Sequence, residues 1–183
     1  MAMWDAALSH TVNLAGRLSL ALGLREWATR YKLRAVTSVG EQPIVRGRIW
    51  IHGGGTVVLG DRVELNATAC AIEIHAAPGA EIVLGDDVFV DAGVSIEARE
   101  SVRIGDRSRI GRYCKILDNN FHSLRGDRHE KPGSTPVVVE DDTDLGPMTV
   151  LLPGARIGKG TDVGCGRVIS RPVGMPKAKG PTT

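Results

Sequence analysis

Aliphatic residues recur at every sixth position over most of this chain, each pair separated by a short polar stretch that usually begins with glycine. The pattern is clearest from Leu59 to Leu65, Leu84 to Val90, Ile104 to Ile110 and Ile157 to Val163. A hexad of this kind supplies one short strand and one turn, which is too little to bury its own apolar side. The period therefore predicts an all-β solenoid in which each unit stacks on copies of itself.

The in-phase positions also predict where the solenoid is interrupted. They form four sets: Leu59 and Leu65; Leu84, Val90 and Ile96; Ile104, Ile110 and Ile116; and Leu145, Leu151, Ile157, Val163 and Ile169. Phase slips are expected near residues 75–79, near Val102 and across residues 117–144. Residues inserted at a phase slip can form a loop outside the coils without disrupting the stacking of the coils on either side. The slip across residues 117–144 is the longest.

Residues 1–40 carry a different pattern, with Leu8, Val12, Ala15, Leu18 and Leu22 at helical spacing. This predicted helical segment has a net formal charge of +3. The favoured interpretation is a cap over the open end of the solenoid or a contact with a neighbouring subunit. The alternative is peripheral association with an anionic membrane surface. Residues 41–171 are predicted to form the β-solenoid domain, and residues 172–183 a tail.

Composition narrows the classes of function. The net charge of +2 and the scattered basic residues argue against a nucleic-acid surface, so no nucleic-acid partner is predicted. The apolar stretch at residues 14–24 is short and contains Arg17, so it is not expected to span a bilayer. The three cysteines have no metal or redox spacing and are interpreted as small buried or semi-buried residues in a reducing compartment. The predicted location is the cytoplasm, with the inner membrane face as an option.

The candidate chemistry lies in the longest break of the repeat, a loop predicted at residues 118–136. His122 stands where the next core aliphatic is due, directly after Asp118, Asn119 and Asn120. Long loops that interrupt a regular scaffold usually carry function. The three polar neighbours could fix a histidine tautomer or bind a polyhydroxylated ligand, and the imidazole suits a general base near neutral pH.

The coil at residues 104–111, the loop opening Asp-Asn-Asn-Phe-His122, and the segments from Leu145 and Leu151 resemble the hexapeptide-repeat acyltransferases. The likeness covers about residues 44–179 and is strongest to the sugar and polysaccharide O-acetyltransferases. It implies a left-handed parallel β-helix, a homotrimer with active sites between neighbouring subunits, acetyl-CoA as co-substrate and a sugar, glycan or nucleotide-sugar acceptor. No metal is expected.

The resemblance also implies roles for individual residues. His122 matches the general base, and Asp91 matches an acceptor-binding position one coil earlier; Asp118, Asn119 and Asn120 join it as candidate acceptor contacts. The candidate contacts for acetyl-CoA are Gly146, Cys165, Gly166 and Ser170 along the later coils and Lys177 and Lys179 in the tail. Two features depart from the family: Asp144 stands where many relatives have an aromatic residue, and the linker at residues 171–173 is short.

Several alternatives remain open at this point. N-acylation of a nucleotide-linked amino sugar would use the same base and coils. Serine acetyltransferase is disfavoured because forty residues cannot hold its N-terminal domain. A γ-class carbonic anhydrase would need three converging histidines, here His75, His122 and His129. A non-catalytic scaffold would have no use for the long charged loop.

Overall fold

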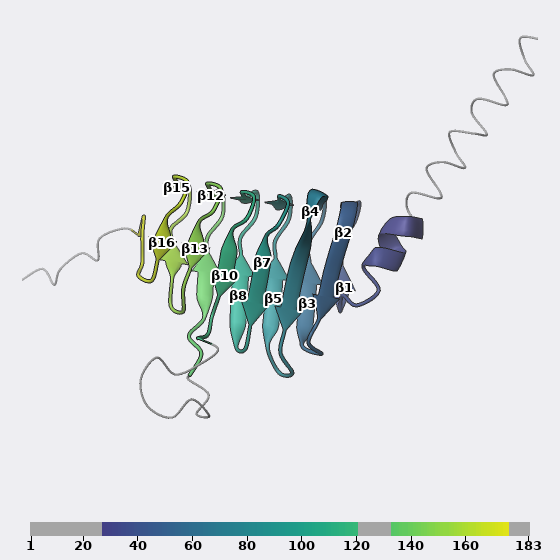
Figure 1. The fold of residues 1–183 in the computed structure, drawn as a ribbon, viewed down its shortest axis with the longest axis horizontal. Helices are drawn as coiled ribbons and strands as arrows, with labels where there is room; N and C mark the ends of the chain where they lie inside the picture. Colours follow the sequence, from purple (N-terminus) through teal and green to yellow (C-terminus); the bar gives the residue numbers. More distant parts are fainter. Residues whose placement is uncertain (1–26, 121–132, 176–183) are drawn as a thin grey trace, which may run out of the picture. The chain divides into compact units, whose positions relative to one another are not determined.

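The computed structural model describes residues 27–120 and 133–175 of the 183-residue chain (Figure 1). It divides into two compact units, residues 1–34 and 35–183. The described part of the first unit holds a short helix at residues 27–32, in which the rings of Trp27 and Tyr31 stack with their centroids 5.7 Å apart. No helix in these described ranges is long and apolar enough to cross a membrane.

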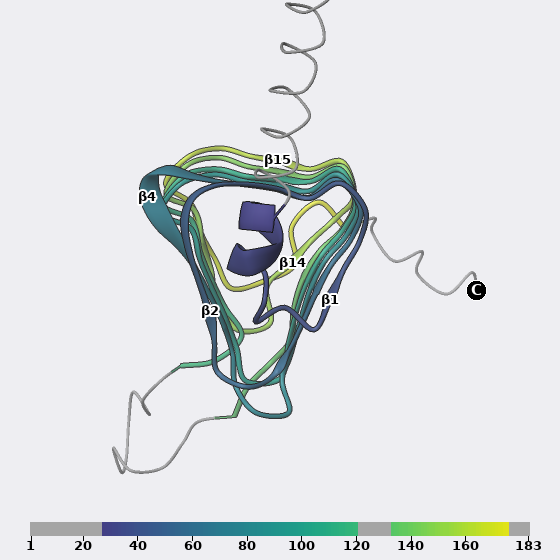
Figure 2. The same ribbon diagram turned by 90° about the vertical axis from the view of Figure 1, so that its right-hand side faces the viewer.

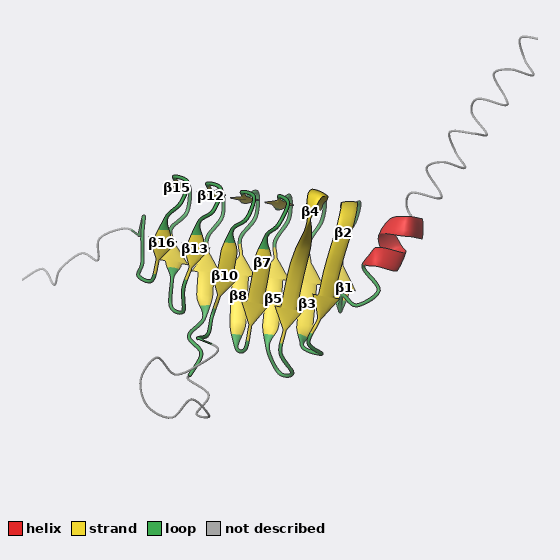
Figure 3. Ribbon diagram, in the orientation of Figure 1, coloured by secondary structure: helices red, strands yellow, loops and turns green. Residues whose placement is uncertain are grey.

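The second unit is a parallel β-solenoid with three faces (Figures 2 and 3). Face three is a six-stranded sheet of β1 (Ser38–Val39), β3 (Thr56–Leu59), β5 (Glu81–Leu84), β8 (Ser101–Ile104), β11 (Val137–Val139) and β14 (Arg156–Ile157). Faces one and two share the long strands β2 (Ile44–His52) and β4 (Glu64–Ala76). Face one continues with β6 (Phe89–Val90), β9 (Arg109–Ile110), β12 (Asp144–Leu145) and β15 (Asp162–Val163). Face two continues with β7 (Ser95–Ala98), β10 (Lys115–Leu117), β13 (Val150–Leu151) and β16 (Val168–Ile169).

The strand register turns the six-residue period into columns of buried side chains inside the prism. These columns are Leu65, Val90, Ile110, Leu145 and Val163 on face one; Ile74, Ile96, Ile116, Leu151 and Ile169 on face two; and Leu59, Leu84, Ile104, Val139 and Ile157 on face three. Burying each aliphatic side chain contributes about 1.5–3 kcal/mol. Each face therefore contributes the aliphatic of the six-residue period to every turn, and face three adds a second buried column of Val57, Ile82, Val102 and Val137.

The solenoid differs from the predicted boundaries at three places. It begins with β1, a few residues before residue 41, because Thr37 and Gly40 donate backbone hydrogen bonds to the next coil. It continues past residue 171, where Val173 bridges to Ile157. Within β4, Leu65 and Ile74 are nine residues apart instead of six, and the exposed residues 68–70 protrude at one corner (Figure 2). The six-residue period does not predict this protrusion.

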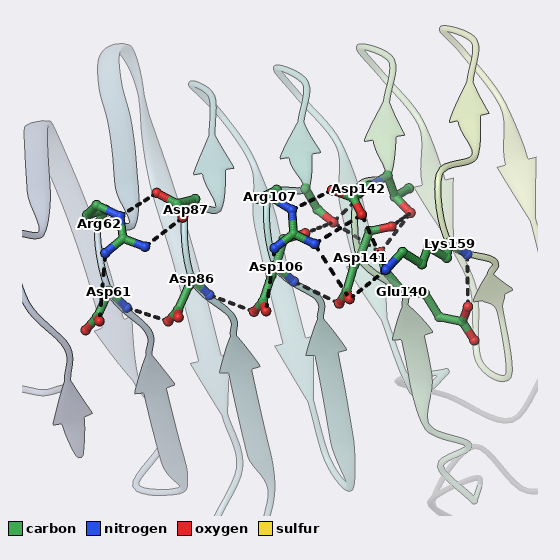
Figure 4. A network of polar contacts seen from close by, with 12 residues as sticks. Asp61, Arg62, Asp86, Asp87, Asp106, Arg107, Glu140, Asp141, Asp142 and Lys159 are labelled. Atoms are coloured by element: carbon green, nitrogen blue, oxygen red, sulfur yellow. Dashed lines mark hydrogen bonds and ion pairs between the residues drawn. The ribbon is translucent and has the colours of Figure 1, made fainter.

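The Gly-Asp dipeptide of the repeat makes the corner between faces three and one, called here the ladder corner (Figure 4). The backbone N–H of Asp61 donates to Oδ1 of Asp86 at 2.8 Å, and the N–H of Asp86 donates to Oδ1 of Asp106 at 2.9 Å. A Cβ on Gly60 would lie 2.5 Å from the first of these oxygens, and one on Gly85 would lie 2.3 Å from the second. Glycine precedes aspartate because it leaves room for the carboxylate of the next coil.

The residue after this aspartate has a left-handed backbone conformation, with φ between 54° and 57° at Arg62, Asp87, Arg107 and Asp142. Arg62 donates to both oxygens of Asp87 at 2.7 and 2.8 Å, and Arg107 pairs with Asp142 in the same way. These hydrogen bonds lower the pKa of Asp87 and of Asp142. At pH values above the ordinary pKa of aspartate, the pairs therefore stabilise the folded chain. That stabilisation is lost as the pH falls through the depressed pKa. The pairs are solvent-exposed, so their contribution is small.

Replacing Gly85 with alanine is expected to destabilise the solenoid. The new methyl group would displace the Asp106 carboxylate and leave the N–H of Asp86 without its acceptor. We expect the free energy of unfolding, measured by urea titration, to fall by about 1–3 kcal/mol. Gly164→Ala is the matched control, because a Cβ there would meet no atom within 4 Å and the backbone is not left-handed. Equal urea midpoints for the two variants would contradict this account of the Gly-Asp dipeptide.

Candidate active site

The predicted loop leaves the solenoid at the corner between faces two and three, called here the loop corner, after β10 and before β11. Its two ends are joined at the foot. Asn119 and Ser134 form an antiparallel bridge, and the N–H of Thr135 donates to the carbonyl oxygen of Asp118 at 2.8 Å. His122 lies outside the described residues. The foot fixes where the segment containing His122 begins and ends.

Asp118 is the centre of this foot. Its side chain is fully buried, and its carboxylate accepts hydrogen bonds from the backbone N–H groups of Arg99, Glu100 and Ser101 at 2.7–3.0 Å. The Asn119 side-chain amide donates to the same carboxylate at 3.0 Å. Asp118 therefore ties the loop to the turn that precedes β8 in the coil before it.

The two asparagines after Asp118 differ in exposure. Asn119 is 1% exposed, and its Oδ1 atom is buried without a hydrogen-bond partner in the described part of the chain. Asn120 is exposed. Of the three polar residues predicted to contact an acceptor from the loop, Asn120 alone presents its side chain to solvent in this chain.

The other candidate residues lie at the corner between faces one and two, called here the Tyr113 corner. Its turns are residues 91–93, 111–113, 146–148 and 164–166, and their left-handed positions are Gly93, Tyr113, Met148 and Gly166. Gly146, Cys165 and Gly166 are stacked here in successive coils. A Cβ on Gly146 would lie 2.7 Å from the backbone nitrogen of Cys165, so glycine permits the close approach of these coils.

Asp91 is at the same corner and is held by its neighbours. Its Oδ1 accepts hydrogen bonds from the backbone N–H of Ala92 at 2.8 Å and from the side-chain amide of Asn66 at 3.3 Å. Its Oδ2 accepts from Nε of Arg112 at 3.3 Å. The Asp91 side chain is 16% exposed, whereas that of Arg112 is 56% exposed. The carboxylate thus orients a guanidinium that reaches solvent.

The interpretation of the cysteines is correct for one of the three. Cys114 is buried, its thiol donates to the carbonyl oxygen of Gly146, and burial raises its pKa. Cys70 and Cys165 are exposed free thiols, so the prediction that they are buried or semi-buried is wrong. Cys70 is exposed because it lies in the protrusion of β4, and Cys165 because it occupies a corner turn rather than a strand.

Ser170 lies at the loop corner of the last turn. It lines a hollow of about 400 Å³ together with β15, β16 and the basic side chains of Arg167 and Arg171. Lys177 and Lys179 lie outside the described residues. In the described part of the chain no group of three histidine, cysteine or acidic side chains has metal-binding geometry. His75 instead stacks on His52 with ring centroids 4.6 Å apart, whereas His122 and His129 fall in residues 121–132.

The predicted site residues therefore fall into two groups at opposite edges of face two. Asp91, Gly146, Cys165 and Gly166 are at the Tyr113 corner, and Asp118, Asn119, Asn120 and Ser170 are at the loop corner. One chain does not bring the two groups together. Four neighbouring residues were not predicted from the sequence: Arg112, Tyr113, Arg167 and Arg171. The available signal for Arg112 was the strand register, since pairing Val90 with Ile110 aligns Ala92 with Arg112.

No family model matches this sequence. Among solved structures it is similar to a mutant of AntD, an N-acyltransferase from Bacillus cereus in complex with dTDP and coenzyme A, with a TM-score of 0.65, 17% identity and 79% of each chain covered. It is also similar to a hexapeptide-repeat-containing acetyltransferase from Vibrio cholerae O1 biovar eltor complexed with acetyl coenzyme A, with a TM-score of 0.57 and 24% identity over 87% of this chain and 75% of that one.

Among curated proteins, the bifunctional protein GlmU of Herminiimonas arsenicoxydans is 29% identical over 181 residues, which is 91% of this chain. The chain spans about a third of the length of that relative, since 35% of it is covered. The prediction of the fold is confirmed by the solved structures and by the strand pairing. The second unit of this chain is a left-handed parallel β-helix of hexapeptide repeats.

Proposed function

We propose that this chain is an acetyl-CoA-dependent O-acetyltransferase that acts on a sugar hydroxyl. The observation that carries the proposal is the foot of the loop. A solenoid needs no such excursion for its own stability, yet the buried Asp118 and Asn119 fix both ends of one that contains His122. The β-helix fold, shared with enzymes solved with coenzyme A and acetyl coenzyme A, supports the same class of co-substrate.

The proposed reaction is direct transfer in a ternary complex. The acceptor oxygen attacks the thioester carbonyl carbon of acetyl-CoA while His122 takes the hydroxyl proton. The tetrahedral intermediate then expels the thiolate of coenzyme A, which is protonated, and an acetyl ester remains on the sugar. Holding both substrates together supplies much of the rate enhancement. A general base contributes about a hundred- to ten-thousand-fold.

We assign acetyl-CoA to the Tyr113 corner and the last turn. The stacked turns are built of small residues, half-buried at Gly146 and exposed at Cys165 and Gly166, which suits a pantetheine arm. The hollow at the last turn adds two cationic side chains, Arg167 and Arg171, near Ser170. Guanidinium groups bind phosphate oxygens well. The proposed phosphate contacts are therefore Arg167 and Arg171 as well as Lys177 and Lys179.

We further propose that the active unit is a homotrimer. Asp91, Gly146, Cys165 and Gly166 are at one edge of face two, and the foot of the loop is at the other edge. A closed ring of prisms would bring the loop corner of one subunit to the Tyr113 corner of the next. Each active site would then contain His122 from one subunit and Asp91 from its neighbour.

A second candidate function is N-acylation of a nucleotide-linked amino sugar. The likeness to AntD, which was solved with dTDP and coenzyme A, favours it. The base and the coenzyme A positions would be the same, because an amine attacks the thioester just as a hydroxyl does. The acceptor alone separates the two proposals.

The test is release of thiol from acetyl-CoA in the presence of neutral sugars, acidic sugars, oligosaccharides and nucleotide-linked amino sugars. Acceptor-dependent release supports the transferase, and mass spectrometry of the product distinguishes an ester from an amide. No release with any acceptor, together with no binding of coenzyme A by calorimetry, would overturn the proposal.

We also propose that the helix at residues 27–32 contacts anionic membranes, which is the alternative to a capping role in the sequence analysis. In the described helix Trp27 is 66% exposed and Tyr31 is 56% exposed, next to Arg30 and Arg34. Aromatic and basic residues together favour the membrane interface. We expect the double substitution Trp27→Ala and Tyr31→Ala to reduce co-sedimentation with phosphatidylserine vesicles by about tenfold. Trp50→Ala, which removes an exposed tryptophan of the β-helix, is the control; an equal loss in both variants would contradict the proposal.

A further inference from the structure

Arg112 carries unused hydrogen-bonding capacity at the Tyr113 corner. The Nε–H group of its guanidinium donates a hydrogen bond to Asp91. No other described residue accepts a hydrogen bond from the guanidinium. Arginine has five N–H donors arranged in a planar fork that matches carboxylate and phosphate oxygens. Holding the group through Nε leaves the outer donors on a side chain that is 56% exposed.

The Asp91 carboxylate is in turn fixed from several directions. Ala92 and Asn66 donate to one of its oxygens, and Asn66 accepts a hydrogen bond from the hydroxyl of Thr68 at 3.0 Å. Thr68 opens the protrusion of β4. A guanidinium anchored in such a network loses less conformational entropy on binding a ligand than a free one. The arrangement therefore preorganises Arg112.

Tyr113, the next residue, adds an exposed aromatic ring at the same corner. A Cβ on Gly93 would lie 2.4 Å from Cδ1 of Tyr113, so the ring lies directly on the backbone of Gly93. Tyr113 is 50% exposed and has a φ of 60°, a conformation that is costly for a bulky residue. The left-handed conformation belongs to this turn and recurs at Met148 one coil later, and at Tyr113 it carries a ring that reaches solvent. Aromatic rings provide flat surfaces on which sugar or base rings can lie.

We propose that Arg112 and Tyr113, oriented by Asp91 and Gly93, form a subsite that selects acceptors carrying a negative charge. This rests on the proposed acyltransferase function and adds the class of its acceptor. The guanidinium binds the anionic group, which is either the carboxylate of an acidic sugar or the phosphate of a sugar phosphate or nucleotide sugar. Asp91 is then a positioning residue that acts through Arg112.

The experiment compares wild type with Arg112→Gln on acceptors that share a glucose-type ring: neutral methyl glucoside and anionic glucuronate, glucose 1-phosphate and dTDP-glucose. We expect the KM of wild type to be lower for an anionic acceptor than for methyl glucoside. Arg112→Gln should raise the KM of the anionic acceptor about 10- to 100-fold, which is the loss of one charge-assisted contact. The KM values for acetyl-CoA and methyl glucoside should not change. Preference for glucuronate or for the phosphates identifies the anionic group.

Two further variants separate positioning from charge alone. Arg103→Gln removes an exposed arginine that pairs with Glu81 on face three, and it should leave every KM unchanged. Asp91→Asn should raise the KM of the anionic acceptor by less than Arg112→Gln does. Equal effects of Arg112→Gln on charged and neutral acceptors would overturn the subsite.

A binding measurement keeps this test separate from the proposed activity. Calorimetric titration of wild type with glucuronate and glucose 1-phosphate should show binding that Arg112→Gln weakens and Arg103→Gln does not. If no acceptor releases thiol but this difference persists, the proposed function fails and the anion site stands. If wild type and Arg112→Gln bind both probes equally, the anion site is wrong whatever the activity.

Discussion

Replacing His122 with alanine is expected to reduce kcat by about a hundred- to ten-thousand-fold, because the variant lacks the base proposed to take the proton from the attacking hydroxyl. The KM for acetyl-CoA should change little, since the proposed coenzyme A contacts lie on the later coils. His129→Ala, which removes the other histidine of the same loop, is the matched control and should leave kcat within about twofold. The measurement is the rate of thiol release at saturating substrates. Equal losses in the two variants would contradict the assignment of the base to His122.

The His122→Ala variant also tests whether active sites are shared between subunits. Cys165→Trp would fill the exposed surface assigned to the pantetheine arm and should be inactive on its own. When equal amounts of His122→Ala and Cys165→Trp subunits are unfolded and refolded together, about a quarter of the wild-type activity should return. Each trimer that contains both variants has one site in which the His122 half and the Cys165 half are both intact. If each site lay within one chain, the mixture would stay inactive.

Asp118→Ala is expected to produce the largest loss of stability. It would leave the backbone N–H groups of Arg99, Glu100 and Ser101 without the buried carboxylate that accepts from all three. We expect the free energy of unfolding to fall by about 3 kcal/mol or more. For a chain of this size that corresponds to a drop in Tm of roughly 6–12 °C, measurable by calorimetry.

Asp144→Ala is the control for this substitution, because Asp144 is an exposed aspartate on face one. It should shift Tm by no more than about 2 °C. Asp118→Asn keeps one carbonyl oxygen and should be intermediate. Because the foot sets where the loop begins, Asp118→Ala should also lower kcat at temperatures where the variant is still folded. A Tm shift equal to that of Asp144→Ala would show that the buried carboxylate does not hold the corner.

The solenoid could be predicted almost entirely from the repeat, because each turn repeats one local rule, whereas its left hand was implied only by the resemblance to a known family. The spacing of Leu84, Val90 and Ile96 is set by the width of a face, and the glycine before Asp86 is set by the carboxylate of the next coil. Both constraints act between equivalent residues of adjacent coils, so they return at a fixed period. The protrusion of β4 escaped prediction because one insertion of three residues has no periodic signal.

The candidate site was predictable only in part. The longest phase slip and the histidine inside it marked the loop, and the resemblance to acyltransferases supplied the proposed role of His122. The function of Asp118 was not visible, because its partners at residues 99–101 are set by stacking rather than by sequence proximity. Arg112 was overlooked for the same reason, since its partner Asp91 is one coil away.

The sequence by itself determined the architecture of this protein: a repeat too short to bury its own apolar side has to stack, and the period fixes which side chains face inward. The tertiary structure decided which corner each polar residue occupies, and so separated the foot of the loop from Asp91 and Arg112 by the full width of face two. Periodicity specifies contacts between neighbouring coils, whereas the corner that a side chain occupies depends on how many residues every earlier coil contains.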